Sequence, residues 1–158
     1  MTQDIGHWTY PINFDPNQYI GFIYQITNKV TGKKYIGRKQ LHSKQRKQVK
    51  LVSDPNRTKT QIKTKQSDWK TYTGSSRQLN EEIAALGKHK FIFEILSLHK
   101  SLSSLNYAEV YMLVTSNALT SYFRNGEPAF YNGMIPPVKT RPKPDQSNDT
   151  AYEETEAD

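Results

Sequence analysis

The sequence predicts a small α/β domain in which a three-stranded antiparallel sheet is flanked by helices. Three segments rich in β-branched and aromatic residues, at residues 20–27, 34–37 and 91–97, predict the strands. Two segments with capping serines and apolar residues predict helices, one before and one after the third strand. The order strand, strand, helix, strand, helix in a chain of 158 residues is typical of this class.

Local residue types set the connections between these elements. Residues 28–33 contain Asn, Thr and Gly, which form tight turns, so the first two strands should pair as an antiparallel hairpin. Gly87 suits the left-handed residue after the first helix, and the second helix should end near Ser116 or Leu119. The candidate N-caps are Ser75 or Ser76 for the first helix and Ser103 or Ser104 for the second.

Composition divides the chain into three parts. Residues 1–20, rich in Pro, Asn, Asp and aromatics, predict an irregular lead-in, and residues 21–135 hold all the predicted elements. Residues 136–158 are Pro-rich and then acidic, and predict a disordered tail because they have almost nothing to bury. Residues 38–66 are mostly Lys, Arg, Gln, Ser and Thr, which predicts a long basic loop inserted in the domain.

Several classes of protein are excluded by residues that the chain lacks. The absence of cysteine excludes a disulfide scaffold, a thiolate zinc site and a cysteine nucleophile. No apolar run approaches the ~18 residues that a membrane span needs, and the first residues lack the basic and apolar regions of a secretory leader. We therefore expect a soluble cytoplasmic protein with no membrane partner.

Positive charge is concentrated in one part of the chain. The net charge is +7, but residues 33–70 alone contain 13 Lys and Arg against two acids, Asp54 and Asp68. Such a block can neutralise phosphates and release their counterions, which favours a polyanion partner. A solvated basic loop without a fixed partner explains the composition equally well. The candidate nucleic-acid contacts are Lys39, Lys44, Arg46, Lys47 and Lys50.

Two tyrosines of the predicted hairpin form a candidate site. Tyr24 and Tyr35 lie in opposite strands, so their phenols would be close together if both project from one face. Arg38 follows Tyr35 by three residues, and its guanidinium can donate several hydrogen bonds to phosphate oxygens. A nearby cation also favours the phenolate form of a tyrosine. Half-buried tyrosines are common in any sheet, so spacing alone leaves both interpretations open.

The tripeptides around these tyrosines resemble the signature of a known family. Phe22-Ile23-Tyr24 and Tyr35-Ile36-Gly37 are similar to the two tripeptides of the GIY-YIG nuclease superfamily and have its typical spacing. The first tripeptide is a variant, since Gly21 lies one place before the position of the family's glycine. The resemblance runs from about residue 21 to residue 133, and residues 67–76 resemble a block shared by small stand-alone phage-encoded members.

The resemblance also points to residues later in the chain. The family's metal-binding glutamate, on the helix after the third strand, matches Glu109. Helical spacing supports this choice independently, because Leu105 and Leu113 place the carboxylate at the border of the apolar face. The asparagine that braces the family's site matches Asn132, although the pair Asn132-Gly133 also suits an ordinary turn.

The family's catalytic arginine has two candidates. We favour Arg38, because His42 follows it by four residues and because other members carry a basic residue directly after the second tripeptide. Arg46, eleven residues after Tyr35, is the alternative. The other histidines have no such setting and are expected at the surface: His7, His89 and His99.

The resemblance implies an endonuclease that hydrolyses phosphodiester bonds of double-stranded DNA with one divalent cation, Mg²⁺ or Mn²⁺ as a substitute. Glu109 would hold the ion and Arg38 would neutralise charge on the phosphate. Tyr24 or Tyr35 would accept a proton from the attacking water, which His42 would position. A homing, a restriction-like and a DNA-degrading role are all compatible with the sequence, as are a monomer and a homodimer. The alternative function is a non-catalytic nucleic-acid-binding module.

Overall fold

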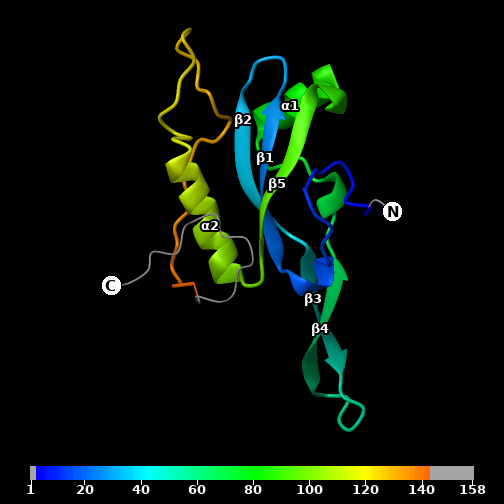
Figure 1. The fold of residues 1–158 in the computed structure, drawn as a ribbon. Helices are drawn as coiled ribbons and strands as arrows, with labels where there is room; N and C mark the ends of the chain where they lie inside the picture. Colours follow the sequence, from blue (N-terminus) through cyan, green and yellow to red (C-terminus); the bar gives the residue numbers. More distant parts are fainter. Residues whose placement is uncertain (1–2, 143–158) are drawn as a thin grey trace.

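The computed structural model describes residues 3–142, which contain a three-stranded sheet, a separate two-stranded hairpin and two α-helices (Figure 1). The α/β class and the three-stranded antiparallel sheet are confirmed. The strands, in the order β2-β1-β5, are β2 (Lys34–Gln40), β1 (Gly21–Asn28) and β5 (Phe91–His99). The acidic part of the predicted tail, from residue 143 onward, lies outside the described residues.

The side chains of β1 alternate between two hydrophobic cores. Phe22, Tyr24 and Ile26 face the core that also contains residues of α1 (Arg77–Leu86). Ile23 points the other way, into the core formed with α2 (Leu102–Thr115). Because successive strand residues face opposite sides, the two helices cover opposite faces of the sheet. Neither helix, nor any other helix within residues 3–142, is long and apolar enough to cross a membrane.

The described part of the N-terminal segment is irregular apart from the short 3-10 helix η1 (Pro16–Gln18). Trp8 and Phe14 are nevertheless buried in the core beside β1. Thr9 exchanges backbone hydrogen bonds with β5, donating to Phe93 at 2.8 Å and accepting from Ile95 at 3.0 Å. The lead-in therefore covers the outer edge of β5 and protects it from pairing with another chain.

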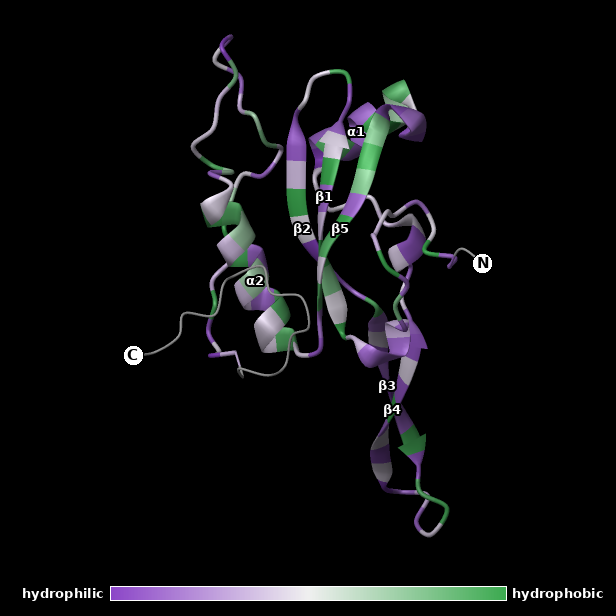
Figure 2. Cartoon of the chain, in the orientation of Figure 1, coloured by the Kyte–Doolittle hydropathy of each residue, from purple (hydrophilic) through white to green (hydrophobic). Residues whose placement is uncertain are grey.

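The prediction of a long loop at residues 38–66 is wrong. β2 continues to Gln40, and beyond Leu41 the chain forms a second antiparallel hairpin, of β3 (His42–Lys50) and β4 (Thr58–Gln66). Low apolar content indicated a loop, but cross-strand backbone hydrogen bonds need no buried face, and the many threonines favour extended backbone. We call β3 and β4 the ribbon; it projects away from the sheet and is hydrophilic over most of its length (Figures 1 and 2).

The helix boundaries are confirmed for α1, and for α2 at its C-terminal end, where Ser116 is the C-cap; only the start of α2 is shifted. The Oγ of Ser76 accepts a hydrogen bond from the backbone N–H of Leu79 at 3.3 Å, and Gly87 ends α1 with a φ of 91°. Ser101, rather than Ser103 or Ser104, caps α2. The short 3-10 helices η2 (Trp69–Thr71) and η3 (Lys88–Lys90) flank α1.

The prediction that His99 and His7 lie at the surface is also wrong. His99 is fully buried, with Nε2 2.7 Å from Ser97 Oγ and Nδ1 2.8 Å from Ser104 Oγ. His7 is half-buried and stacks on Phe93. Burial lowers the pKa of each imidazole to about 4, so both are neutral at pH 7. The burial of each ring depends on packing that forms only in the fold.

Candidate active site

The residues of the candidate site lie around the outer edge of β2, the edge that does not pair with β1. The chain at residues 129–132 lies along this edge, and the Tyr131 N–H donates to the Lys34 carbonyl at 2.7 Å. The side chain of Asn132 continues the pairing: its Oδ1 accepts from the Ile36 N–H at 3.0 Å, and its Nδ2 donates to the Ile36 carbonyl at 2.7 Å. Asn132 thus holds the middle of the second tripeptide as a neighbouring strand would.

Glu109 reaches the same edge from α2. Its Oε1 lies 3.4 Å from Nε of Arg38, and the backbone N–H of Arg38 also donates to this carboxylate. The Glu109 side chain is only 13% exposed, because Leu105 and Leu113, one turn away on either side, are buried in the core. Burial raises the pKa of Glu109 above its ordinary value of 4.5, and Arg38 partly offsets this rise.

The two predicted tyrosines lie on one face of the hairpin, as expected. The ring centroids of Tyr24 and Tyr35 are 6.1 Å apart. Tyr24 pairs with Gly37 across the strands, and a Cβ at this glycine would collide with the Tyr24 hydroxyl group. Burial raises the pKa of Tyr24 well above 10.0, with further contributions from neighbouring tyrosines and from Glu109. Gly37 is therefore needed for a phenol to lie against the edge where Glu109 sits.

A third tyrosine, which the sequence did not single out, completes the cluster. The ring of Tyr72 lies 6.1 Å from that of Tyr24, edge to face. Nζ of Lys39 is 4.0 Å from the Tyr72 ring centroid and 2.7 Å from Oδ1 of Asp68. Burial raises the pKa of Tyr72 above 10.0. The only signal for Tyr72 in the sequence was its place in residues 67–76, the block that resembles phage-encoded family members.

One cleft of about 330 Å³ joins the two sides of the β2 edge. Tyr35 and Ser75 line it from one side, Glu109 from the other, and Asn132 from the C-terminal segment. The Tyr35 hydroxyl lies 2.9 Å from Ser75 Oγ. Since the charge of Glu109 also raises the pKa of Tyr24, the acid and the phenols share one electrostatic environment.

His42 and Arg46, two other predicted site residues, lie outside this cleft. His42 begins β3, and its Nε2 donates to the Pro16 carbonyl at 3.0 Å. A four-residue separation brings side chains together on a helix, but on extended strands it separates them by about 13 Å. His42 and Arg38 line a neighbouring hollow of about 320 Å³. Arg46 is exposed on the ribbon, so Arg38 is the arginine that the fold brings to Glu109.

The predicted nucleic-acid contacts follow β2 and β3 in two groups. Lys39 is only 19% exposed, because its ammonium lies between Asp68 and Tyr72. The others are exposed along the ribbon: Lys44, Arg46, Lys47 and Lys50.

The acidic residues suit one kind of metal ion better than another. In the part of the chain that the structure describes, no three His, Cys, Asp or Glu side chains gather to hold an ion. A structural zinc site needs four such ligands and is not supported. Mg²⁺ keeps several waters and binds through one or two carboxylates plus substrate phosphates. Glu109, a lone carboxylate on an open cleft, fits this second mode.

Comparison with known proteins identifies the family. A family model described as "Putative endonuclease segE, GIY-YIG domain" matches residues 7–135. The chain belongs to this GIY-YIG family. Comparisons with curated proteins and with solved structures give no significant match. The match begins before the first tripeptide, so this GIY-YIG domain includes Trp8 and Phe14 of the N-terminal segment. Membership implies a nuclease, and GIY-YIG nucleases generally depend on divalent metal ions.

Proposed function

We propose that the protein is a divalent-metal-dependent endonuclease of double-stranded DNA whose active site is the cleft at the β2 edge. The observation that carries the proposal is the ion pair between Arg38 and Glu109, on an edge shared with Tyr35, in a chain of the GIY-YIG family. Glu109 also lies in a cleft with a pKa raised by burial and a charged partner, Arg38, which is typical of a functional group.

Glu109 and Arg38 have complementary roles in this proposal. Glu109 would hold Mg²⁺ or Mn²⁺, and the ion, when bound, polarises the scissile phosphate and stabilises the leaving oxygen. Arg38, whose side chain is 39% exposed, binds the phosphoryl oxygens and neutralises their developing charge. Its ion pair with Glu109 keeps the guanidinium at the cleft before DNA arrives.

We assign the proton transfer to Tyr35 rather than Tyr24. Tyr24 is 1% exposed, and burial raises its pKa well above 10.0, so its hydroxyl keeps its proton. Tyr35 lines the cleft, where its Oη can accept a proton from the attacking water while its own proton passes to Ser75 Oγ, 2.9 Å away. Ser75 is exposed and releases its own hydroxyl proton to solvent at the same time. Tyr24 hydrogen-bonds to Tyr35 and orients it.

His42 receives a different role from the one predicted. Its ring lines the hollow next to the cleft, together with Lys39 and Ser43. We propose that this hollow binds a phosphate beside the scissile one, and that the exposed lysines of β3 bind phosphates farther along the duplex.

The test is incubation of the protein with supercoiled plasmid in Mg²⁺ and, in parallel, in EDTA. Nicked or linear product in Mg²⁺ alone is the expected result. Binding of the plasmid without cleavage under either condition would show a non-catalytic DNA-binding module, and the nuclease proposal would then be wrong. A second preparation is assayed in Mn²⁺, so that a missing product cannot be due to one inactive preparation or to the choice of ion.

A further inference from the structure

The proposed function uses only the lysines of β3 and leaves the rest of the ribbon without a role. β3 and β4 pair with each other and not with the three-stranded sheet. All of β4 is exposed, and in β3 only His42 and Val49 are partly covered. A hairpin with no buried face is marginally stable in water, so this one gains little by existing as structure alone.

The base of the ribbon is fixed beside the active site. Leu41 is completely buried; its N–H donates to the Ile20 carbonyl and its carbonyl accepts from the Ser67 N–H, both at 2.9 Å. Arg38, which pairs with Glu109 of the cleft, also lines a hollow with His42 and Ser43, the first residues of β3. DNA that presents a phosphate to Arg38 therefore continues past the ribbon.

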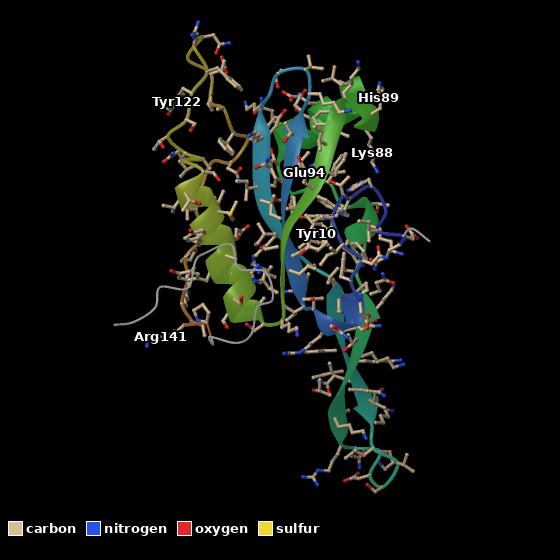
Figure 3. The ribbon with its side chains drawn as sticks, in the orientation of Figure 1. Tyr10, Lys88, His89, Glu94, Tyr122 and Arg141 are labelled. Carbon is tan, nitrogen blue, oxygen red and sulfur yellow. The ribbon has the colours of Figure 1, made fainter. Side chains whose placement is uncertain are left out.

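The charge and width of the ribbon identify the part of DNA that it fits. Its two strands contain seven Lys and Arg residues and no acid. Side chains stand out from both faces along its length (Figure 3). The major groove, ≈ 12 Å wide, admits a two-stranded ribbon, whereas the minor groove is only ≈ 6 Å wide. Nine paired residues extend for about 30 Å, which is close to one turn of the duplex.

The two faces of the ribbon carry different chemistry. One face, which we call the Arg46 face, has Arg46 directly opposite Ile62, which is 56% exposed. Arg46 is the one arginine in the two strands. Its guanidinium matches O6 and N7 of guanine, and an exposed apolar side chain matches the methyl group of thymine. Lys44 and Lys50 flank Arg46 on the same face, two and four residues away, where they can bind phosphates on either side of the bases. The opposite face carries only lysines as its charged residues: Lys47, Lys59, Lys63 and Lys65.

We propose that the ribbon enters the major groove of the DNA substrate and that Arg46 and Ile62 read base edges there, so that the ribbon determines where the nuclease cuts. The inference rests on the proposed function, since it takes double-stranded DNA as the ligand. Eight residues separate Arg38 from Arg46, at most about 26 Å of extended chain. At 3.4 Å per base pair, the guanine read by Arg46 lies within about eight base pairs of the cleaved bond.

The first test compares Arg46→Ala with Lys47→Ala, which removes the same charge from the neighbouring position on the opposite face. Both positions are exposed, so neither variant disturbs the core. Cleavage is measured on four duplexes that differ only in the base pair at the guanine position. We expect Arg46→Ala to lose a preference for guanine of about 5- to 150-fold. Lys47→Ala should keep this preference while its binding to all four duplexes weakens by the same factor.

The second test locates the groove. A cleavable duplex is treated with dimethyl sulfate, which methylates guanine N7 in the major groove and adenine N3 in the minor groove, and is then bound in EDTA. Methylation of the guanine should reduce binding of the wild-type protein and of Lys47→Ala, but not of Arg46→Ala. Interference at adenine N3 alone, or identical behaviour of the two variants, would overturn the inference.

The outcomes also separate the inference from the nuclease proposal. Cleavage without any base preference by the wild-type protein contradicts the reading role and leaves the nuclease intact. Guanine N7 interference in a protein that fails to cut in Mg²⁺ or Mn²⁺ supports the reading role and contradicts the nuclease. Ile62→Ser, which changes no charge, should reduce only the preference for an adjacent thymine.

Discussion

At Glu109, burial and the neighbouring Arg38 have opposite effects on the ionised carboxylate. Leu105 and Leu113 are buried on either side of it, so its carboxylate loses most of its hydration. Arg38 restores part of the lost stabilisation through its guanidinium and its backbone N–H. The net result is a raised pKa, which means that the ionised form is destabilised by the fold. A carboxylate whose pKa is perturbed by burial and by one charged partner is typical of a functional group.

We expect Glu109→Gln to raise the melting temperature at pH 7. Because burial raises the pKa of Glu109 in the folded state, ionisation costs stability as the pH rises past its ordinary value of 4.5 and up through the raised value. The advantage of the glutamine should therefore vanish at pH 4. Thermal unfolding from pH 4 to pH 8 measures this, with the exposed Glu81→Gln as control. A lower melting temperature for Glu109→Gln at pH 7 would contradict the account.

Phenylalanine variants of the two tripeptide tyrosines should differ in their cleavage rates. Tyr35→Phe removes the proposed proton acceptor and should slow cleavage at saturating DNA by about 100-fold or more, without a change in DNA binding. Tyr24→Phe keeps the packed ring and removes only an orienting hydroxyl, so its effect on the rate should be smaller. Single-turnover cleavage provides the comparison, and a greater loss in Tyr24→Phe would reverse the assignment.

Among the elements, β5 and α2 are joined by a buried polar link. His99 at the end of β5 lies between Ser97 and Ser104, and both ring nitrogens have hydroxyl partners. The link fixes the start of the helix that carries Glu109, which follows about two turns later. At the other edge of the sheet, Asn132 provides the corresponding link to β2.

The histidine link predicts a loss of stability in mild acid. Burial lowers the pKa of His99 to about 4 from 6.5, so its contribution is complete above pH 6.5 and is lost as the pH falls toward 4. The full loss is on the order of 3 kcal/mol. Denaturant unfolding of His99→Gln should show a shallower pH dependence in this window, with His89→Gln as control. His7 contributes a similar dependence that remains in both variants. An unchanged slope for His99→Gln would contradict the link.

In the whole molecule, we expect the domain to determine the stability of the fold and the ribbon to contribute to DNA binding. No residue of β3 or β4 belongs to either hydrophobic core. Replacing residues 43–65 with a short Gly-Ser turn should therefore change the unfolding free energy by no more than about 0.5 kcal/mol. The same change removes eight Lys and Arg residues and should flatten the salt dependence of DNA binding, since each phosphate contact contributes about −0.9 to the slope. An unchanged slope would contradict DNA contact by the ribbon.

Local patterns in the sequence predicted most of the domain but little of what depends on long-range contact. The β-branched and aromatic residues of β1 and the serine cap of α1 are local signals, and both elements are confirmed. Helical spacing also placed Glu109 at the border of the apolar face of its helix. The burial of His99 and the third tyrosine of the cluster, Tyr72, depend on segments that meet only after folding. Neither therefore gives a periodic signal.

The ribbon was missed for a different physical reason. Its residues have no apolar face, and hydrophobic periodicity is the main signal for a strand in a sequence. Backbone pairing between β3 and β4 is invisible to that signal, although the alternating threonines of β4 were a weak indication.

The central claim, that Glu109, Arg38 and Tyr35 form one nuclease active site, is tested most directly by the cleavage rate of Glu109→Gln. Supercoiled plasmid in Mg²⁺ is the substrate, and a mobility shift in EDTA reports binding separately. The account predicts that cleavage falls by at least about 100-fold while DNA binding is retained, because loss of even a supporting residue of a metal site costs 10–100-fold. Cleavage by Glu109→Gln at the wild-type rate would contradict it.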